Sequence, residues 1–247
     1  MIRRPRPFLI LTFRRTGGTA LTGALSRASP FPAARHEPLD PDRDLGALTR
    51  AYQVDRDEAA LHAALDQALA RRPNLKHCID TVPAQITRAL IEICAAKGYR
   101  LAFLTRRDEG RRLRSLAIAR ATGAWGPRQA ERIFPEILSG RTTPRPIDLK
   151  EVERAARTDA AALGTTLRLL RNRGLPYAWW LFEEIYAGTR PPVREVARCA
   201  RQLGLRLRAS DPAFAPLTTS RVDTETIIPY LPDLPEAEAL IARLVAD

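Results

Sequence analysis

Two arginines, two threonines and two glycines near the start of the chain are of the types that bind an anion. An apolar run, Phe8-Leu9-Ile10-Leu11, leads into Arg14-Arg15-Thr16-Gly17-Gly18-Thr19. Small and apolar residues then recur at helical spacing, at Ala20, Leu21, Ala24 and Leu25. A strand, a glycine turn and a helix start direct backbone N–H groups and a helix dipole at one point. Arg15 and the Thr16 and Thr19 hydroxyls would add charge and hydrogen-bond donors, so this loop predicts a phosphate or sulfate site.

The same glycines are also compatible with a simple tight turn between a strand and a helix, so the loop alone leaves both interpretations open. It does not match GxxxxGK[ST], and no lysine lies near it in the sequence. It does not match the GxGxxG of dinucleotide-binding folds either.

A second basic motif follows another strand candidate, Tyr99 to Thr105. Arg106-Arg107-Asp108 comes next, and Ser115 lies eight residues after Arg107, about two helical turns on. Arg107 and Ser115 are placed to hold a second phosphate. The alternative is a surface arginine and a solvent-facing serine in an arginine-rich chain.

Short apolar runs alternate with amphipathic helices, which predicts an α/β fold with a mostly parallel central sheet and helices on both faces. Further strand candidates are 75–79 and 177–182. Ligands of such sheets bind at the carboxyl ends of the strands where the strand order reverses, so both basic motifs are expected at one crevice. We expect a single domain over 1–247, with a long loop at 29–54. Irregular excursions are expected at 126–150, with room for a short helix at 128–138, and at 209–235.

The composition narrows the classes of partner. Of 40 Lys and Arg residues only three are lysines, and the net charge is +12. The arginines are spread along predicted helices and do not form a tail, so we do not expect nucleic acid as the ligand. Three cysteines without metal-ligand spacing indicate reduced thiols and no metal site, and hence a cytoplasmic protein. No signal peptide or integral membrane segment is visible.

Taken together, the motifs resemble the PAPS-dependent sulfotransferases, above all the bacterial trehalose- and lipopolysaccharide-type enzymes. Arg15-Thr16-Gly17-Gly18-Thr19 matches that family's phosphosulfate loop, within 8–28. Leu104 to Asp108 with Ser115 matches its 3′-phosphate motif, within 99–125. The stretch from Ala119 to Trp125 resembles the family's ARxTGxW segment. The resemblance covers roughly residues 8 to 190.

The resemblance implies a P-loop-like three-layer fold and transfer of a sulfuryl group from 3′-phosphoadenosine 5′-phosphosulfate (PAPS) to a hydroxyl of a carbohydrate or glycolipid acceptor, with no metal. Arg14 to Ala20, Arg107 and Ser115 would bind the donor, with Arg15 also stabilising charge during transfer. Arg221 is a weak candidate for the family's late basic loop. His36-Glu37-Pro38 stands where these enzymes have an acidic residue near the acceptor, which favours Glu37 as the base and leaves His36 as the alternative.

Two departures from the family pattern stand out. Gly18 replaces the commoner Ser or Thr, and the late glycine-containing loop is not recognisable. A kinase would use the same fold but needs a P-loop lysine and a magnesium-binding aspartate, for which the sequence shows no candidate. A non-catalytic nucleotide- or nucleic-acid-binding protein stays open, as do the acceptor and the oligomeric state, for which a homodimer is one option.

Overall fold

The computed structural model describes residues 5–32, 35–186, 192–208, 211–214, 217 and 224–246. The chain groups into two compact units. The first comprises Met1–Thr105 and Asp159–Leu217, and the second comprises Arg106–Thr158 and Thr218–Asp247. The first unit has an apolar core on each face of its sheet, and the second unit has one apolar core.

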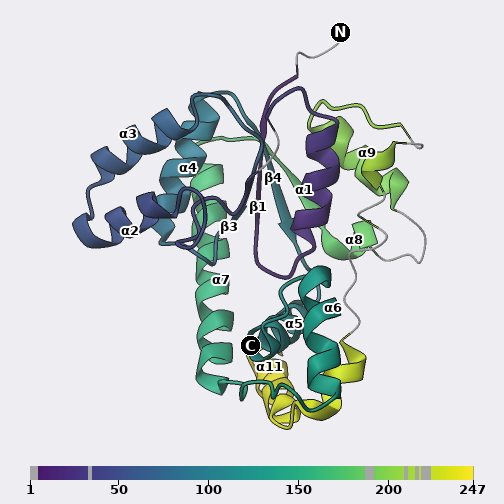
Figure 1. Ribbon diagram of the computed structural model, residues 1–247. Helices are drawn as coiled ribbons and strands as arrows, with labels where there is room; N and C mark the ends of the chain where they lie inside the picture. The colour runs from purple at the N-terminus through teal and green to yellow at the C-terminus, as the bar shows by residue number, and fades with distance from the viewer. Residues whose placement is uncertain are drawn as a thin grey trace. The chain divides into compact units, whose positions relative to one another are not determined.

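The first unit is built on a five-stranded parallel sheet (Figure 1). Its strands are β1 (Phe8–Thr12), β2 (Arg35–His36), β3 (Leu75–Cys78), β4 (Arg100–Thr105) and β5 (Tyr177–Leu181), in the order β2-β3-β1-β4-β5. The predicted α/β class with a parallel sheet is therefore confirmed.

Alternate residues of the central strands face two different cores. On one side, Leu9 and Leu11 of β1 pack with α3 (Glu58–Ala68), α4 (Ala84–Ala96) and the second half of α7 (Leu149–Asn172). On the other side, Phe8 and Ile10 pack with α1 (Gly18–Arg27) and α9 (Val193–Gln202). Because β1 is buried on both faces, its sequence is a continuous apolar run and not an alternating pattern. Helices thus cover both faces of the sheet, which gives the helix–sheet–helix layering seen in Figure 1.

The strand order reverses beside β1. The chain passes from β1 to β2 and β3 on one side of it, and then to β4 and β5 on the other. The loop that follows β1 therefore starts at the topological switch point, where parallel sheets bind their ligands.

The second unit is helical. It contains α5 (Glu109–Thr122), α6 (Pro127–Leu138), the first part of α7, the 3-10 helix η2 (Glu225–Tyr230) and α11 (Leu234–Ala246). Leu116 and Ile118 of α5 belong to its core together with Ile241 of α11.

The short helix expected at 128–138 within 126–150 is present as α6. Pro127 opens this helix, and Ala130, Phe134 and Ile137 give it an apolar face at helical spacing. The loop expected at 29–54 contains α2 (Gly46–Asp55), which packs Tyr52 into the core.

Asp57 caps the start of α3, although Asp55 with Glu58 also forms a capping-box pattern in the sequence. The Asp57 carboxylate accepts a hydrogen bond from the Ala60 N–H at 2.9 Å. Asp55 instead ends α2. In 209–235, the described residues include the 3-10 helices η1 (Pro212–Phe214) and η2, and α11 begins at its end.

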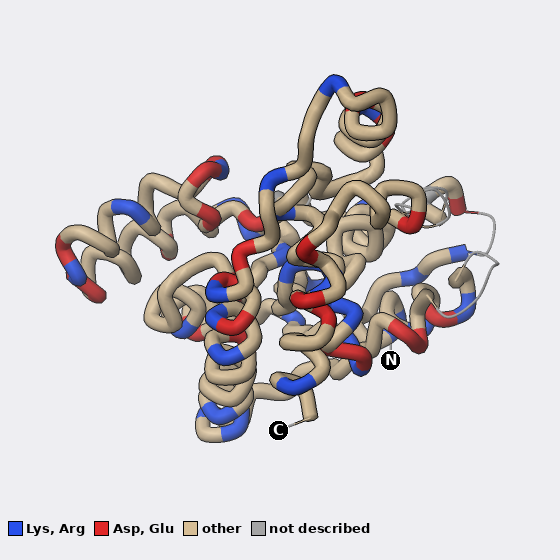
Figure 2. The backbone as a smooth tube through the Cα atoms, turned by 90° about the horizontal axis from the view of Figure 1, so that it is seen from below, with Lys and Arg blue, Asp and Glu red and all other residues tan. Residues whose placement is uncertain are grey.

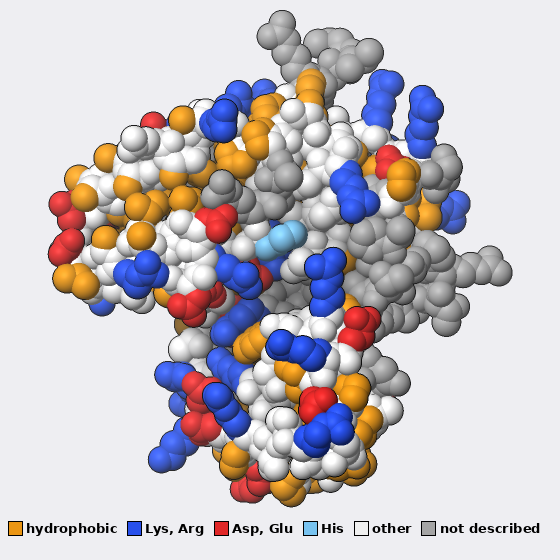
Figure 3. All heavy atoms as spheres, in the orientation of Figure 1, with side chains coloured by type: hydrophobic (Ala, Val, Ile, Leu, Met, Phe, Trp, Pro, Cys, Tyr) orange, Lys and Arg blue, Asp and Glu red, His pale blue; other side chains and the backbone are white. Residues whose placement is uncertain are grey.

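In the described part of the chain, no helix is long and apolar enough to cross a membrane. Cys78, Cys94 and Cys199 are free and buried. Lys and Arg alternate with Asp and Glu along the helices (Figure 2), and on the face shown in Figure 3 the basic side chains are scattered among acidic and apolar ones.

Candidate functional site

The loop between β1 and α1 has the backbone geometry of an anion cradle. Gly17, the residue before α1, is in the left-handed region with φ 70°, and Arg15 shares that region with φ 68°. Among the described residues, no side chain caps the start of α1, and its first turn holds no acidic residue. The first N–H groups of this helix are therefore available to an anion, and the helix dipole favours one.

The Thr16 hydroxyl points into the protein. Thr16 is buried, and its hydroxyl donates to the Phe13 carbonyl at 2.7 Å and contacts the Thr12 hydroxyl. The Thr12 hydroxyl in turn donates to the Leu104 carbonyl on β4 at 2.9 Å. These bonds fix the loop to the sheet, so the Thr16 hydroxyl is used to hold the loop in place.

Gly17 lies beneath two aromatic rings of α8 (Phe182–Tyr186). A Cβ on Gly17 would lie 2.9 Å from Tyr186 Cε2 and 3.0 Å from Phe182 Cε2. The Tyr186 hydroxyl donates to the Gly17 carbonyl at 2.9 Å. The helix that follows β5 therefore packs on the predicted phosphosulfate loop.

A buried lysine from the next strand reaches the start of α1. The Lys76 side chain on β3 is 4% exposed, and its Nζ donates to Thr19 Oγ1 at 2.9 Å and to Glu37 Oε1 at 2.5 Å. Glu37 follows β2 and adopts φ 54°. Cys78 Sγ donates to the same Glu37 oxygen at 3.4 Å. The predicted base and the predicted anion loop thus share one ammonium group.

The charges of this cluster are set by burial and by the pairing. Burial alone would raise the pKa of Glu37, but the Lys76 ammonium and the hydrogen bonds from Lys76 and Cys78 outweigh it and hold that pKa below its ordinary value. Burial alone would lower the pKa of Lys76, but its acidic neighbours, Glu37 among them, raise it. Burial keeps the pKa of Cys78 well above its ordinary value, so Cys78 remains a thiol.

The other candidate base, His36, lies next to this pair. Burial lowers the pKa of His36, and the Lys76 charge lowers it further, so the imidazole is neutral at neutral pH. Its Nδ1 is buried and has no hydrogen-bond partner among the described residues. A neutral ring is the form a base requires, which keeps His36 open as the alternative.

Arg14 pairs with an acidic residue that follows β3. Its Nε donates to Asp80 Oδ2 at 2.7 Å, and its backbone N–H donates to Asp80 Oδ1 at 3.2 Å. The Asp80 side chain is buried. This pair ties the loop to the end of β3, so Arg14 has a structural role in addition to its predicted contact with the donor.

The predicted 3′-phosphate residues belong to the second unit. Arg107 is exposed and precedes α5, whereas Ser115 lies within α5 and is half-buried. Asp108 caps this helix by accepting from the Arg111 N–H at 2.9 Å. The loop between β1 and α1 belongs to the first unit. A nucleotide site shared by this loop with Arg107 and Ser115 therefore stays a prediction. Arg221 lies outside the described residues.

Sequence reasoning missed Lys76 and Asp80. Both are far from the glycine loop in sequence, and the adjacent pairing of β1 and β3 brings them to it. The available signal was a charged residue inside a short apolar strand candidate and an aspartate just after its end. A lysine there is costly to bury unless it has a partner, which makes it a candidate for function.

Replacing Gly17 with alanine should destabilise the protein, whereas the same replacement at Gly23, a glycine inside α1, should not. Gly17→Ala puts a Cβ in the left-handed region, at about 1–2 kcal/mol, and against two rings, at about 1–3 kcal/mol more. Gly23→Ala lies inside α1 with nothing within 4 Å of its Cβ and should stabilise by about 0.5–1 kcal/mol. Urea unfolding of both variants measures this, and equal stabilities would contradict the loop geometry.

Removing only the lysine of the buried pair should cost more than removing both charges. Lys76→Met leaves the Glu37 carboxylate without its ammonium and should lower the free energy of unfolding by about 3–5 kcal/mol at pH 7. Lys76→Met/Glu37→Gln should recover much of that loss. Because folding lowers the pKa of Glu37, its ionised carboxylate stabilises the folded protein fully above the ordinary carboxyl pKa. This stabilisation is lost as the pH falls through the lowered pKa of the folded protein.

Because folding raises the pKa of Lys76, the stabilisation from its ammonium group is lost only as the pH rises through the raised pKa of the folded protein. The Lys76–Glu37 pair therefore contributes fully to stability near neutral pH. The loss of unfolding free energy caused by Lys76→Met should therefore be smaller at acid pH than at pH 7. Denaturation of the three proteins at pH 7 and pH 4 tests this. A single variant as stable as the double variant would show that the pair is not coupled.

No protein-family model matches this chain, and no curated protein is significantly similar to it. The function therefore has to be inferred from the motifs and from the geometry of the site.

Proposed function

We propose that this chain is a PAPS-dependent sulfotransferase whose donor phosphosulfate binds at the loop between β1 and α1. The observation that carries the proposal is the juxtaposition at this loop of helix N–H donors, the Lys76 ammonium and the Glu37 carboxylate. An anion site and a general base are the two functions that sulfuryl transfer to a hydroxyl requires.

The proposed reaction forms one bond to sulfur and breaks another. The acceptor hydroxyl oxygen attacks sulfur, the bond from sulfur to the bridging phosphate oxygen breaks, and adenosine 3′,5′-bisphosphate leaves. Negative charge grows on that bridging oxygen. Arg15, the N–H groups at the start of α1 and the Lys76 ammonium are the groups that would stabilise it, as preorganised donors do at other transferring groups.

The proton of the acceptor passes to Glu37 in this scheme. Its lowered pKa keeps it ionised at neutral pH, which a base requires, although it also makes the carboxylate a weaker base. His36 is the alternative acceptor of the proton. The acceptor class, a glycan or another hydroxyl compound, rests on the family resemblance.

In this proposal Arg107 and Ser115 would bind the 3′-phosphate of the donor, as the family resemblance implies. Their motif follows β4, and β1 and β4 are adjacent parallel strands with Thr12 opposite Leu104. The two predicted phosphate motifs therefore follow neighbouring strand ends. The free, buried cysteines support a cytoplasmic location as part of the same proposal.

A nucleotide kinase is the second candidate, because Lys76 and Asp80 are a lysine and an aspartate, the two residue types that a kinase needs and that the sequence motifs lack. However, Lys76 pairs with Glu37 and Asp80 pairs with Arg14. Those pairings favour the sulfotransferase, and a non-catalytic nucleotide-binding protein would share the same contacts.

Adenosine 3′,5′-bisphosphate should stabilise the protein. At a ligand concentration one hundred times its dissociation constant the expected gain is about 2.7 kcal/mol, seen as a higher melting temperature. ATP with magnesium should give a smaller shift. A larger shift with ATP would favour the kinase, and no shift or calorimetric heat with the bisphosphate would overturn the proposal.

Arg107→Ala should weaken binding of adenosine 3′,5′-bisphosphate and leave binding of AMP nearly unchanged. The loss of a charge-assisted contact to the 3′-phosphate should be about 1.5–3 kcal/mol by calorimetry. Arg111→Ala is the matched control, since Arg111 is also exposed, lies in the same region and pairs with Asp108. Equal losses for both nucleotides would show that Arg107 does not recognise the 3′ position, and Arg106 would be examined next.

A further inference from the structure

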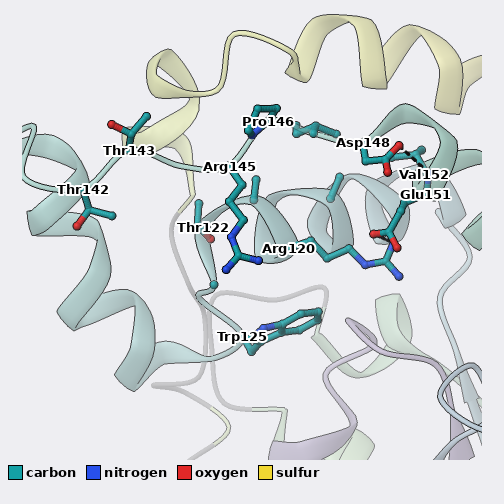
Figure 4. Close-up of a pocket in the computed structure, with 14 residues that line it drawn as sticks. Arg120, Thr122, Trp125, Thr142, Thr143, Arg145, Pro146, Asp148, Glu151 and Val152 are labelled. Atoms are coloured by element: carbon teal, nitrogen blue, oxygen red, sulfur yellow. Dashed lines mark hydrogen bonds and ion pairs between the residues drawn. The ribbon is translucent and has the colours of Figure 1, made fainter.

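The second unit contains a cavity that shares no residue with the loop site. Its volume is about 680 Å³, within the range of small-molecule sites. It is lined by the carboxyl-terminal half of α5, the link to α6, and the segment 142–152 that leads into α7. Figure 4 shows these side chains.

Backbone contacts hold the walls of the cavity in place. Gly123 ends α5 in the left-handed region with φ 75°. The Arg145 N–H donates to the Ala121 carbonyl at 2.9 Å, which fixes the segment 142–152 against α5. The Asp148 carboxylate accepts from the Lys150 and Glu151 N–H groups at the start of α7, at 2.9 and 3.2 Å.

Most polar side chains of the cavity are already satisfied within the protein. The Thr122 hydroxyl donates to the Ile118 carbonyl at 2.8 Å and accepts from the Ala124 N–H. Glu151 pairs with Arg120 at 3.6 Å and with Arg154 at 2.5 Å. These groups are therefore poor candidates for binding a ligand that needs many hydrogen bonds.

The guanidinium of Arg145 differs from these groups. Within the described part of the chain it has no ion pair or hydrogen bond, although it lines the cavity. An arginine presents a planar fork of donors that matches a carboxylate in a bidentate manner. The cavity therefore offers one strong position for a single anionic group.

The remaining lining is mainly apolar. It includes Ala117, Ala121, Ile147 and Val152, together with Trp125, which is 40% exposed. In Figure 4 the Arg145 side chain and the Trp125 ring are directed toward the same space. A flat apolar ring fits against an indole face at low conformational cost.

We propose that this cavity binds an aromatic carboxylate, with its ring against Trp125 and the apolar wall and its carboxylate paired with Arg145. A polar, hydroxyl-rich ligand fits less well, because Thr122, Asp148 and Glu151 already make hydrogen bonds or ion pairs inside the protein. The site is independent of the function proposed for the loop.

Calorimetric titration of the full chain with 2-naphthoate tests this site, with 2-naphthamide as the neutral analogue. Arg145→Gln should lower the affinity for naphthoate about 10- to 100-fold and leave that for naphthamide unchanged. Trp125→Ala should weaken both. Arg141→Gln is the matched control, because Arg141 is exposed, lies four residues away and pairs with Glu136 outside the cavity.

Arg145→Gln should keep the native melting temperature, because the structural contact of Arg145 is made by its backbone. If that variant fails to fold, Arg145→Lys keeps the charge without the fork and should show an intermediate loss. No binding of naphthoate at about 5 mM, where even affinities near millimolar are visible, would overturn the proposal. An unchanged affinity of Arg145→Gln for naphthoate would also overturn it. So would binding of methyl glucuronide or AMP that is tighter than binding of naphthoate and is abolished by Arg145→Gln.

Discussion

A buried ammonium group needs a carboxylate partner, and the Lys76–Glu37 pair meets this need beside the loop that follows β1. The pair constrains its surroundings. Glu37 is held with φ 54°, a conformation that non-glycine residues rarely adopt. A Cβ on Gly18 would lie 3.2 Å from Lys76 Cδ and 3.4 Å from Thr12 Cγ2. The glycine that departs from the sulfotransferase pattern is therefore explained by packing, since a Ser or Thr at this position would crowd the lysine stem.

The parts of the fold that local sequence determines were predictable. The apolar run of β1, the glycines after it and the helical spacing of α1 each point to the observed element. The short α6 was also expected, at 128–138, although Pro135 inside it and the prolines around it weaken the period of its apolar face. Asp55 and Asp57 are both plausible caps in sequence, and only the end of α2 at Asp55 decides between them.

The central part of the candidate site was not predictable in the same way. Lys76 reaches Thr19 and Glu37 across 57 and 39 residues of sequence, through strand pairing that no local pattern encodes. Arg14 looked like a donor-binding arginine, and its bond to Asp80 depends on the same pairing of β1 with β3. Motifs thus identified the loop, whereas the charges that surround it follow from strand order. Because one fold supports many activities, those charges carry more of the functional argument than the fold class does.

The shared lysine also has a consequence for the proposed chemistry. In the protein alone, the Lys76 ammonium lowers the pKa of Glu37 and so weakens it as a base. A phosphosulfate bound at the start of α1 would bring negative charge to the same ammonium, next to Thr19. Like charges disfavour each other's ionised forms, so the bound donor would raise the pKa of Glu37 toward its ordinary value. Glu37 would then become a better proton acceptor only when the sulfuryl group is in place. Thus the contact that makes a buried lysine tolerable would also couple donor binding to activation of the base.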